Sequence, residues 1–483
     1  MNTVQSQTNA LQNQQKQIDQ LINQLKDVQD KSTAGAAASS AAVTVPNPTP
    51  PAGVPSFYSD AGSFLIPGTK TTMKVGGFAK LDVSYDLNAG IGEPGSQSLG
   101  INSAAIATGK NGFSLPGTQA AHQIDRYQMS ARTSRIALQT NTPTELGNVK
   151  FFLEGDFQGG GTGNQSSSNS APFRFRQAYG TLGNWTLGET FTLWQDRATL
   201  PGSWDISSGA GMEGGKRTPV IQYRLDLDPE QKNQISFGLE NPVNDFQGAD
   251  TETFSTATYT MPTNNVTKAP DYLMRFAHNW SGGRVYATTL LRYLEVNDAG
   301  SIDPAYALTG KNMTVHGSAL GWGLNLGGKL YTGVGHKNNN VVYRLIGGQG
   351  ISSYINAGNA FSAVINRTGS LNTVPVAGYT VAYQHWFSDQ WQANAIFGQQ
   401  HVWNPNTLLG PTLTQGLQKN LSELDINAVW FPYPWVQMGP SYYYAATDVV
   451  KGYNLTGVPG TTRLTSGTAA HDHRFMYSTI IGF

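Results

Sequence analysis

Short segments in which apolar and polar residues alternate recur along most of this chain, and they restrict its fold more than any other feature. In the final segment, Phe475, Tyr477 and Phe483 share one side of the alternation, whereas Asp472 and Arg474 share the other. Successive side chains of a β-strand point to opposite faces, so each such segment predicts a strand with one apolar and one polar face. The chain is therefore predicted to be an all-β protein.

About 16 segments with this pattern can be counted. The expected strands are residues 71–88, 126–141, 148–158, 172–182, 185–193, 217–228, 232–241, 270–280, 284–296, 313–326, 329–336, 376–387, 391–402, 420–431, 435–447 and 471–483. Between them, long gaps rich in Gly, Ser, Asn, Thr and Pro alternate with short ones. An up-and-down barrel with an even number of strands produces this alternation, and a soluble sandwich gives no reason for it.

The placement of tryptophan also favours a membrane barrel. Most of the tryptophans flank the short gaps, namely Trp185, Trp280, Trp386, Trp391, Trp430 and Trp435. Aromatic residues gather at the membrane interfaces of such barrels, whereas a soluble core predicts no preference for one rim. The sequence therefore predicts a transmembrane barrel of about 16 antiparallel strands over residues 71–483. The terminal Phe483 also resembles the C-terminal signature of bacterial outer-membrane barrels.

The composition excludes several other classes of protein. A net charge of zero argues against a nucleic-acid-binding protein, which would carry an excess of Lys and Arg. The absence of cysteine excludes disulfides and thiolate metal sites. No run of about 18 apolar residues is present to form a transmembrane helix. Polar residues follow Met1 directly, so we expect a mature start from which a signal peptide has been removed.

Motifs for catalysis or for cofactor binding are weak or missing. The segment Gly209–Gly214 matches a dinucleotide fingerprint, but it lacks the strand and helix that would flank a real one. His471 and His473 share a strand face, yet no third metal ligand accompanies them. The hydrolase motifs Gly-x-Ser-x-Gly and His-Glu-x-x-His do not occur. We therefore expect no enzymatic activity, no cofactor and no bound metal.

A heptad pattern precedes the predicted barrel. The apolar core positions of this pattern are Val4, Leu11, Ile18, Leu21, Leu25 and Val28. Such a narrow apolar stripe needs partner helices, so we expect a short α-helical coiled coil over residues 1–32. A frayed helix or a disordered tail is the alternative, and the pattern does not separate a dimer from a trimer. Residues 33–70 are rich in Ala, Ser and Pro, and they are expected to form a linker.

Five short motifs follow one another in the first half of the predicted barrel. They read SARTSRIAL at 130–138, LEGDF at 153–157, FRFRQAYG at 173–180, LGET at 187–190 and RTP at 217–219. In this order they resemble the DcaP-like trimeric porins, a family that also carries an N-terminal coiled coil. The resemblance implies a homotrimer in the bacterial outer membrane, in contact with its lipid and lipopolysaccharide, with the coil in the periplasm.

The same resemblance implies a function. It implies passive diffusion of small hydrophilic solutes, with a preference for small anions such as dicarboxylates. A sugar-type or non-selective porin is one alternative, and a barrel with a mainly structural or adhesive role is another.

The gap 194–216 follows the fifth expected strand, where general porins fold an external loop into the lumen. We expect this gap to form the constriction; an ordinary external loop is the alternative.

Charges at a constriction set selectivity. The residues expected there or along the lumen are Arg135, Arg174, Arg176, Arg197, Arg217, Arg224, Arg292, Glu154 and Asp156. Arginine suits bidentate capture of a carboxylate, although these residues could also merely pair across neighbouring strands. Arg132 and Glu189 share parity with outward apolar residues, so a bulge or a slip of register is expected near them.

Overall fold

The computed structural model describes residues 62–87, 125–159, 171–204, 216–243, 246–247, 251–254, 257–260, 266–302, 312–355, 361–365, 370–403, 418–449 and 470–483. The predicted coiled coil, with its six core positions, lies outside these described residues. Most of the predicted linker lies outside them as well.

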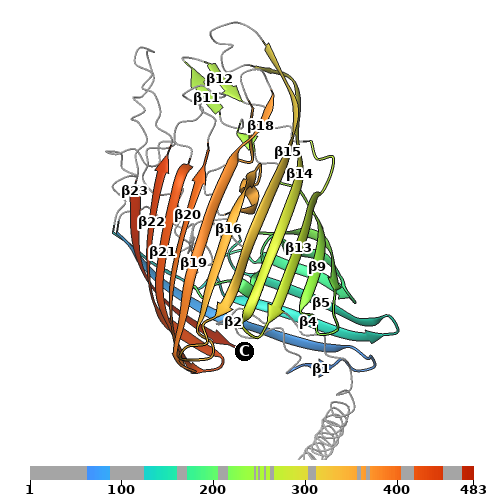
Figure 1. Cartoon of the computed structure of the whole chain (residues 1–483), viewed down its shortest axis with the longest axis vertical. Helices are drawn as coiled ribbons and strands as arrows, with labels where there is room; N and C mark the ends of the chain where they lie inside the picture. Colours follow the sequence, from blue (N-terminus) through green and yellow to red (C-terminus); the bar gives the residue numbers. More distant parts are fainter. Residues whose placement is uncertain are drawn as a thin grey trace, which may run out of the picture.

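Sixteen antiparallel strands form a closed barrel (Figure 1). In chain order they are β2 (Thr72–Asp86), β4 (Arg135–Thr144) with its extension β3 (Arg126–Ser130), β5 (Gly147–Asp156), β6 (Arg174–Leu182), β7 (Trp185–Phe191), β8 (Arg217–Asp226), β9 (Asn233–Glu240), β13 (Asp271–Trp280), β14 (Gly283–Ile302), β15 (Asn312–Tyr331), β16 (Asn340–Gln349), β19 (Pro375–Ser388), β20 (Trp391–Val402), β21 (Gln418–Tyr433), β22 (Val436–Val449) and β23 (Ala470–Gly482). Strand β23 pairs with β2 and closes the ring. The predicted all-β, up-and-down barrel is thus confirmed.

Minor elements accompany the barrel. Strand β1 (Phe64–Leu65) pairs with the start of β2. Short strands β10 (Phe246–Gln247), β17 (Ala363–Ile365) and β18 (Leu371–Thr373) form one small sheet, and β11 (Thr251–Phe254) and β12 (Ala257–Thr260) form another. Two single-turn 3-10 helices, η1 (Arg197–Thr199) and η2 (Ser352–Tyr354), lie in loops. In the described part of the chain, no helix has the length and hydropathy needed to cross a membrane.

The alternating pattern separates an outer apolar surface from an inner polar one. On β23, Phe475 and Ile481 are 52% and 46% exposed, whereas Arg474 and Ser478 are at most 1% exposed. A soluble sheet would bury its apolar face, so exposure of this face and burial of the polar one identify a wall that faces lipid. Exposed tryptophans flank the short turns, and Trp391 stacks on Trp430 with ring centroids 5.8 Å apart. The predicted rim of aromatic residues is present.

The last residue takes part in closing the barrel. The amide of Phe483 donates to the carbonyl oxygen of Gly77 at 3.1 Å, and the amide of Gly77 donates back at 3.3 Å. A Cβ atom on Gly77 would lie only 2.6 Å from the Phe483 ring. Glycine on β2 therefore leaves room for the terminal aromatic side chain.

The predicted tenth and eleventh strands were wrong in their bounds. Residues 312–331 form one strand, β15, and the next strand is β16, which falls in the gap predicted at 337–375. The pair Gly327–Gly328 resembles a turn, but it continues β15. A Cβ on Gly327 would lie 2.6 Å from the Tyr286 hydroxyl, so a neighbouring aromatic side chain covers the glycine.

Strand β16 was missed because it does not alternate between apolar and polar residues. Its inward side chains include Val342 and Ile346, both at most 4% exposed, and its outward side chains include Leu345, which is 54% exposed. The outward face is thus apolar, and the inward face mixes these apolar side chains with Asn340 and Arg344. A run of this kind carries no period-two signal, and only the pairing with β15 and β19 reveals it as a wall strand.

Candidate functional site

The loop after β7 folds into the lumen and crosses it. We call residues 192–204 the constriction segment; they are the described beginning of the predicted gap 194–216. At one end, Trp194 is fully buried, and at the other, Trp204 is 5% exposed. Trp194 belongs to an apolar cluster on β13, β14 and β16, whereas Trp204 packs with residues of β2, β21, β22 and β23. The segment therefore joins two separated parts of the barrel wall.

Charged groups fix the first end of the constriction segment. The carboxylate of Asp196 accepts a hydrogen bond from Arg284 Nε at 2.6 Å. Arg275 donates to the carbonyl oxygens of Leu193 and Gln195 at 3.2 and 3.0 Å. Burial favours the neutral carboxyl of Asp196, but the guanidinium groups of Arg284 and Arg275 outweigh it, and the pKa of Asp196 lies below its ordinary value. Asp196 therefore stays ionised.

Polar contacts also fix the second end. Ser203 Oγ donates to Asp425 at 2.6 Å, and Lys80 Nζ donates to the carbonyl oxygen of Trp204 at 2.9 Å. At the same end, Asn427 donates to the carbonyl oxygen of Gly202 at 3.1 Å. Both ends of the segment are thus held by side chains from the barrel wall, which gives a constriction a defined position.

Five arginines gather on the wall formed by β4 to β8 and on the adjoining constriction segment. We call Arg135, Arg174, Arg176, Arg197 and Arg217, with the carboxylates of Glu154 and Asp156, the arginine cluster. Arg176 bridges the two carboxylates, with Nε 2.7 Å from Glu154 and an NH group 2.7 Å from Asp156. Arg174 binds Asp156 through two hydrogen bonds, of 2.9 and 2.7 Å. Arg135 lies 3.7 Å from Glu154.

The cluster keeps an excess of positive charge. Among its seven named residues, all described in the structure, five guanidinium groups and two carboxylates give a formal sum of 5 − 2 = +3. The guanidinium groups of Arg197 and Arg217 lie over the Phe191 ring, at 3.6 and 5.5 Å from its centroid. Arg217 is repelled by Arg176, Arg174 and Arg135. Like charges at this spacing favour an anion between them.

Two of the expected pore arginines lie elsewhere. Arg224 pairs with Asp226 of its own strand at 3.2 Å, next to the short turn after β8. Arg292 is 1% exposed and pairs with Asp271 at 3.1 Å. Its other donors bind the carbonyl oxygen of Gly350 at 2.7 Å and Ser362 Oγ at 2.9 Å. These contacts tie loops to the wall, so for Arg292 they match the alternative of mutual pairing.

The pairing between strands is irregular near some residues whose inward or outward direction did not follow the alternating pattern. Residues 131–134 interrupt the strand between β3 and β4, and Arg132 is buried there at 7% exposure instead of pointing outward. A bulge at Glu154/Gly155 lets Arg176 and Gln177 both turn inward. Glu189 is the cross-strand neighbour of Pro219, at a position of β7 that alternation assigns to the outer face. The irregularity expected near Arg132 is therefore present, and the β5–β6 bulge helps to concentrate charge in the cluster.

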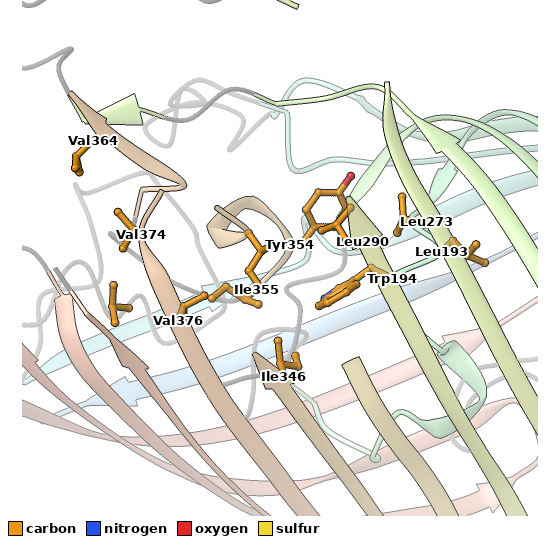
Figure 2. Close-up of a cluster of buried hydrophobic side chains, with 12 residues drawn as sticks. Leu193, Trp194, Leu273, Leu290, Ile346, Tyr354, Ile355, Val364, Val374 and Val376 are labelled. Atoms are coloured by element: carbon orange, nitrogen blue, oxygen red, sulfur yellow. The ribbon is translucent and has the colours of Figure 1, made fainter. Parts of the chain in front are cut away.

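A second loop inside the barrel was not predicted. Figure 2 shows that Tyr354 and Ile355, from the loop after β16, lie beside Trp194, Leu273 and Leu290. Ile351 belongs to the same buried cluster. A signal was present in the sequence, because the apolar residues Ile351, Tyr354 and Ile355 stand close together in a stretch that was expected to be a loop. We call the described residues 350–355 and 361–365 the second lumenal segment.

The described residues contain no group of three or more His, Cys, Asp and Glu side chains that could hold a metal ion. His471 and His473 have ring centroids 5.3 Å apart, and Tyr442 lies at hydrogen-bond distance from His473 Nδ1 (2.7 Å). Both histidines lie near the start of β23.

Comparisons with known proteins agree with the barrel. Residues 41–272 match the model of a family described as the porin subfamily. The outer membrane channel DcaP of Acinetobacter baumannii matches with a TM-score of 0.63 and 16% identity, over 87% of this chain and 100% of that one. An anion-selective porin from Comamonas acidovorans matches with a TM-score of 0.46 and 12% identity, over 86% and 100%.

A search of curated proteins found no match. The match over residues 41–272 shows that this chain is similar to the porin subfamily, and the structural match shows that it has the barrel fold of the outer membrane channel DcaP.

Proposed function

We propose that this porin passes small hydrophilic solutes passively and prefers anions. The observation that carries the proposal is the arginine cluster, in which five guanidinium groups and two carboxylates of the described residues lie beside the constriction segment. A fixed charge of one sign at a narrowing attracts the opposite ion and repels its own. Here that charge is positive.

Dicarboxylates are the solutes that fit this charge pattern best. Arg197 and Arg217 both lie over Phe191, beside the ion pairs that Arg174 and Arg176 make with Glu154 and Asp156. A guanidinium group can bind a carboxylate through two parallel hydrogen bonds. A solute with two carboxylates can therefore contact both arginines at once. A sugar-type channel would instead need a row of aromatic side chains for stacking, and within the described part of the chain the cluster has only Phe191 and Phe78 beside its arginines.

The oligomeric state and the surroundings belong to the same proposal. We propose a homotrimer, with residues 1–32 as a coiled coil in the periplasm and with outward apolar side chains in contact with membrane lipid and lipopolysaccharide. Exposure of such side chains around the wall supports the lipid contact. Chemical cross-linking of the full chain and of a chain lacking residues 1–32 tests this part; a monomer as the main product of the full chain would contradict it.

Reversal potentials in planar bilayers test the selectivity. Across a KCl gradient, the wild-type channel should show a reversal potential of the sign set by chloride, and its size should fall as the total salt rises because ions screen the cluster. The Arg197→Ala/Arg217→Ala variant should move the potential towards zero. Succinate should block chloride current in the wild type more strongly than acetate does. A cation-selective wild type would overturn the proposal.

A further inference from the structure

The second lumenal segment and the constriction segment meet at one pair of carboxylates. Glu240 of β9 and Asp271 of β13 are direct cross-strand neighbours and both point inward. The Tyr354 hydroxyl lies 2.8 Å from Asp271 Oδ2 and 3.2 Å from Glu240 Oε2. Glu240 also accepts a hydrogen bond from Thr192 Oγ1 at 2.7 Å and one from the Leu193 amide at 2.6 Å. A single carboxylate therefore holds the start of the constriction segment and Tyr354 together.

Cations complete this junction. Lys216 Nζ lies 3.4 Å from the centroid of the Tyr354 ring, and the Arg292 guanidinium lies 5.3 Å from it. Lys216 and Arg292 balance the charges of Glu240 and Asp271, so the junction is neutral as a whole. Burial and the two carboxylates hold the pKa of Tyr354 well above its ordinary value. This shift favours the protonated hydroxyl, which donates to the two carboxylates.

Packing on the other side of Tyr354 leaves little free space. Its ring meets Trp194 edge-on, with centroids 6.1 Å apart, and both side chains are at most 1% exposed. A Cβ on Gly323 would lie 2.9 Å from the Trp194 ring, so β15 has no side chain where the indole lies. Ser352 and Ser362 lie 2.9 Å apart through their hydroxyls and close the second lumenal segment on itself. This part of the lumen is filled by protein.

We infer that Tyr354 is a positioning residue of the channel: it holds the second lumenal segment against the constriction segment, closes the lumen beside β9 to β16, and confines solutes to the arginine cluster. The arginine side has the accessible surface this requires, since the side chain of Arg174 is 33% exposed. The inference rests on the proposed function only for the sign of the selectivity. Closure of the second half of the lumen is a statement about pore size and can be tested separately.

The test uses Tyr354→Phe in the full-length channel, which removes the hydroxyl and keeps the ring. Loss of the hydroxyl leaves two neighbouring carboxylates without their shared donor, and the second lumenal segment should separate from them. Single-channel conductance should rise, and the reversal potential should move towards zero because a path past Glu240 and Asp271 opens. Tyr379→Phe is the matched control: it removes a tyrosine hydroxyl that donates to Gln399 at 2.8 Å, on the outward face.

Two further variants keep the test decisive if Tyr354→Phe does not fold. Thr192→Val removes one donor to the same carboxylate from the constriction segment, and it should raise conductance by less than Tyr354→Phe does. Because the chain contains no cysteine, Ser352→Cys/Ser362→Cys can form only one disulfide within a subunit. When this pair is introduced into the otherwise wild-type channel, its oxidation should leave the conductance unchanged. When it is introduced into Tyr354→Phe, its oxidation should reverse part of the rise in conductance. Conductance equal to the wild type in both Tyr354→Phe and Thr192→Val would overturn the inference. If the wild-type channel shows no anion preference but Tyr354→Phe still raises the conductance, only the proposed selectivity is contradicted.

Discussion

The arginine cluster and the junction around Tyr354 are built from the same kinds of charged residue, yet the named groups of the two sites differ in net charge and in packing. On the β4–β8 side, the arginine cluster keeps a formal charge of +3, from five guanidinium groups and two carboxylates. On the β9–β16 side, Glu240 and Asp271 are balanced by Lys216 and Arg292 around Tyr354, and apolar side chains fill the remaining space.

This difference suggests how one barrel can hold the constriction segment rigidly and still present charged side chains to solutes. Buried ion pairs must be fully matched, because an unpaired charge in a dry site is strongly destabilising. Uncompensated charge is tolerated where water still reaches it. The dry side can therefore hold the constriction segment in place, while the wetter side can carry the excess charge that acts on solutes.

The largest effect is expected from opening the dry side. Trp194→Ala removes a fully buried side chain from the apolar cluster and should lower the free energy of unfolding by about 3–5 kcal/mol. Urea unfolding of the barrel in lipid vesicles measures this. Trp185→Ala, at an outward position that is 48% exposed, is the control and should cost much less. Equal losses for the two variants would contradict the idea of a packed half-lumen.

The next effect concerns selectivity on the charged side. Arg174→Ala/Arg176→Ala lowers the formal charge of the cluster from +3 to +1 and leaves Glu154 and Asp156 without their closest partners. The reversal potential in a KCl gradient should lose most of its anion preference. Arg224→Ala, which breaks only a pair with Asp226 near the short turn, is the control. A double variant that is as anion-selective as the wild type would remove these two arginines from the path.

A smaller change should act in the opposite direction. Glu154→Gln raises the formal charge of the cluster from +3 to +4, while the amide oxygen can still accept from Arg176 Nε, which lies 2.7 Å from the carboxylate. Anion preference should therefore increase modestly, and conductance should stay close to that of the wild type. The measurement is again the reversal potential, and a shift towards cations would show that the sign of the cluster does not set selectivity.

The smallest effect is expected in a short turn that belongs to neither side. Backbone amides of Lys232 and Asn233 donate to Asp228 at 2.9 and 2.7 Å, and these hydrogen bonds lower its pKa. The contribution to stability is thus present above the ordinary pKa of aspartate and disappears as the pH falls through the lower folded value. Asp228→Asn should remove this pH dependence from the unfolding midpoint and leave selectivity unchanged. A change in reversal potential would mean that charge far from the cluster matters.

The sequence by itself determined the barrel and most of its wall. Alternation along each strand follows from one physical demand, that one face meets lipid and the other meets water, so it can be recognised without tertiary information. Loop lengths and tryptophan positions follow from the same membrane geometry. Strand β16 was not predicted because Val342 and Ile346, on its inward face, pack against apolar residues and not against water.

Tertiary structure alone decided which charged residues meet. Parity could place Arg135, Arg174, Arg176 and Arg292 on the inner face, but it could not tell that the first three would share a charged cluster while Arg292 would be fully buried beside Asp271. The contacts of Trp194 and Tyr354 likewise join residues 160 positions apart, since 354 − 194 = 160. Local patterns report the environment of a strand, whereas the path of a loop through the lumen depends on partners that only the closed barrel brings together.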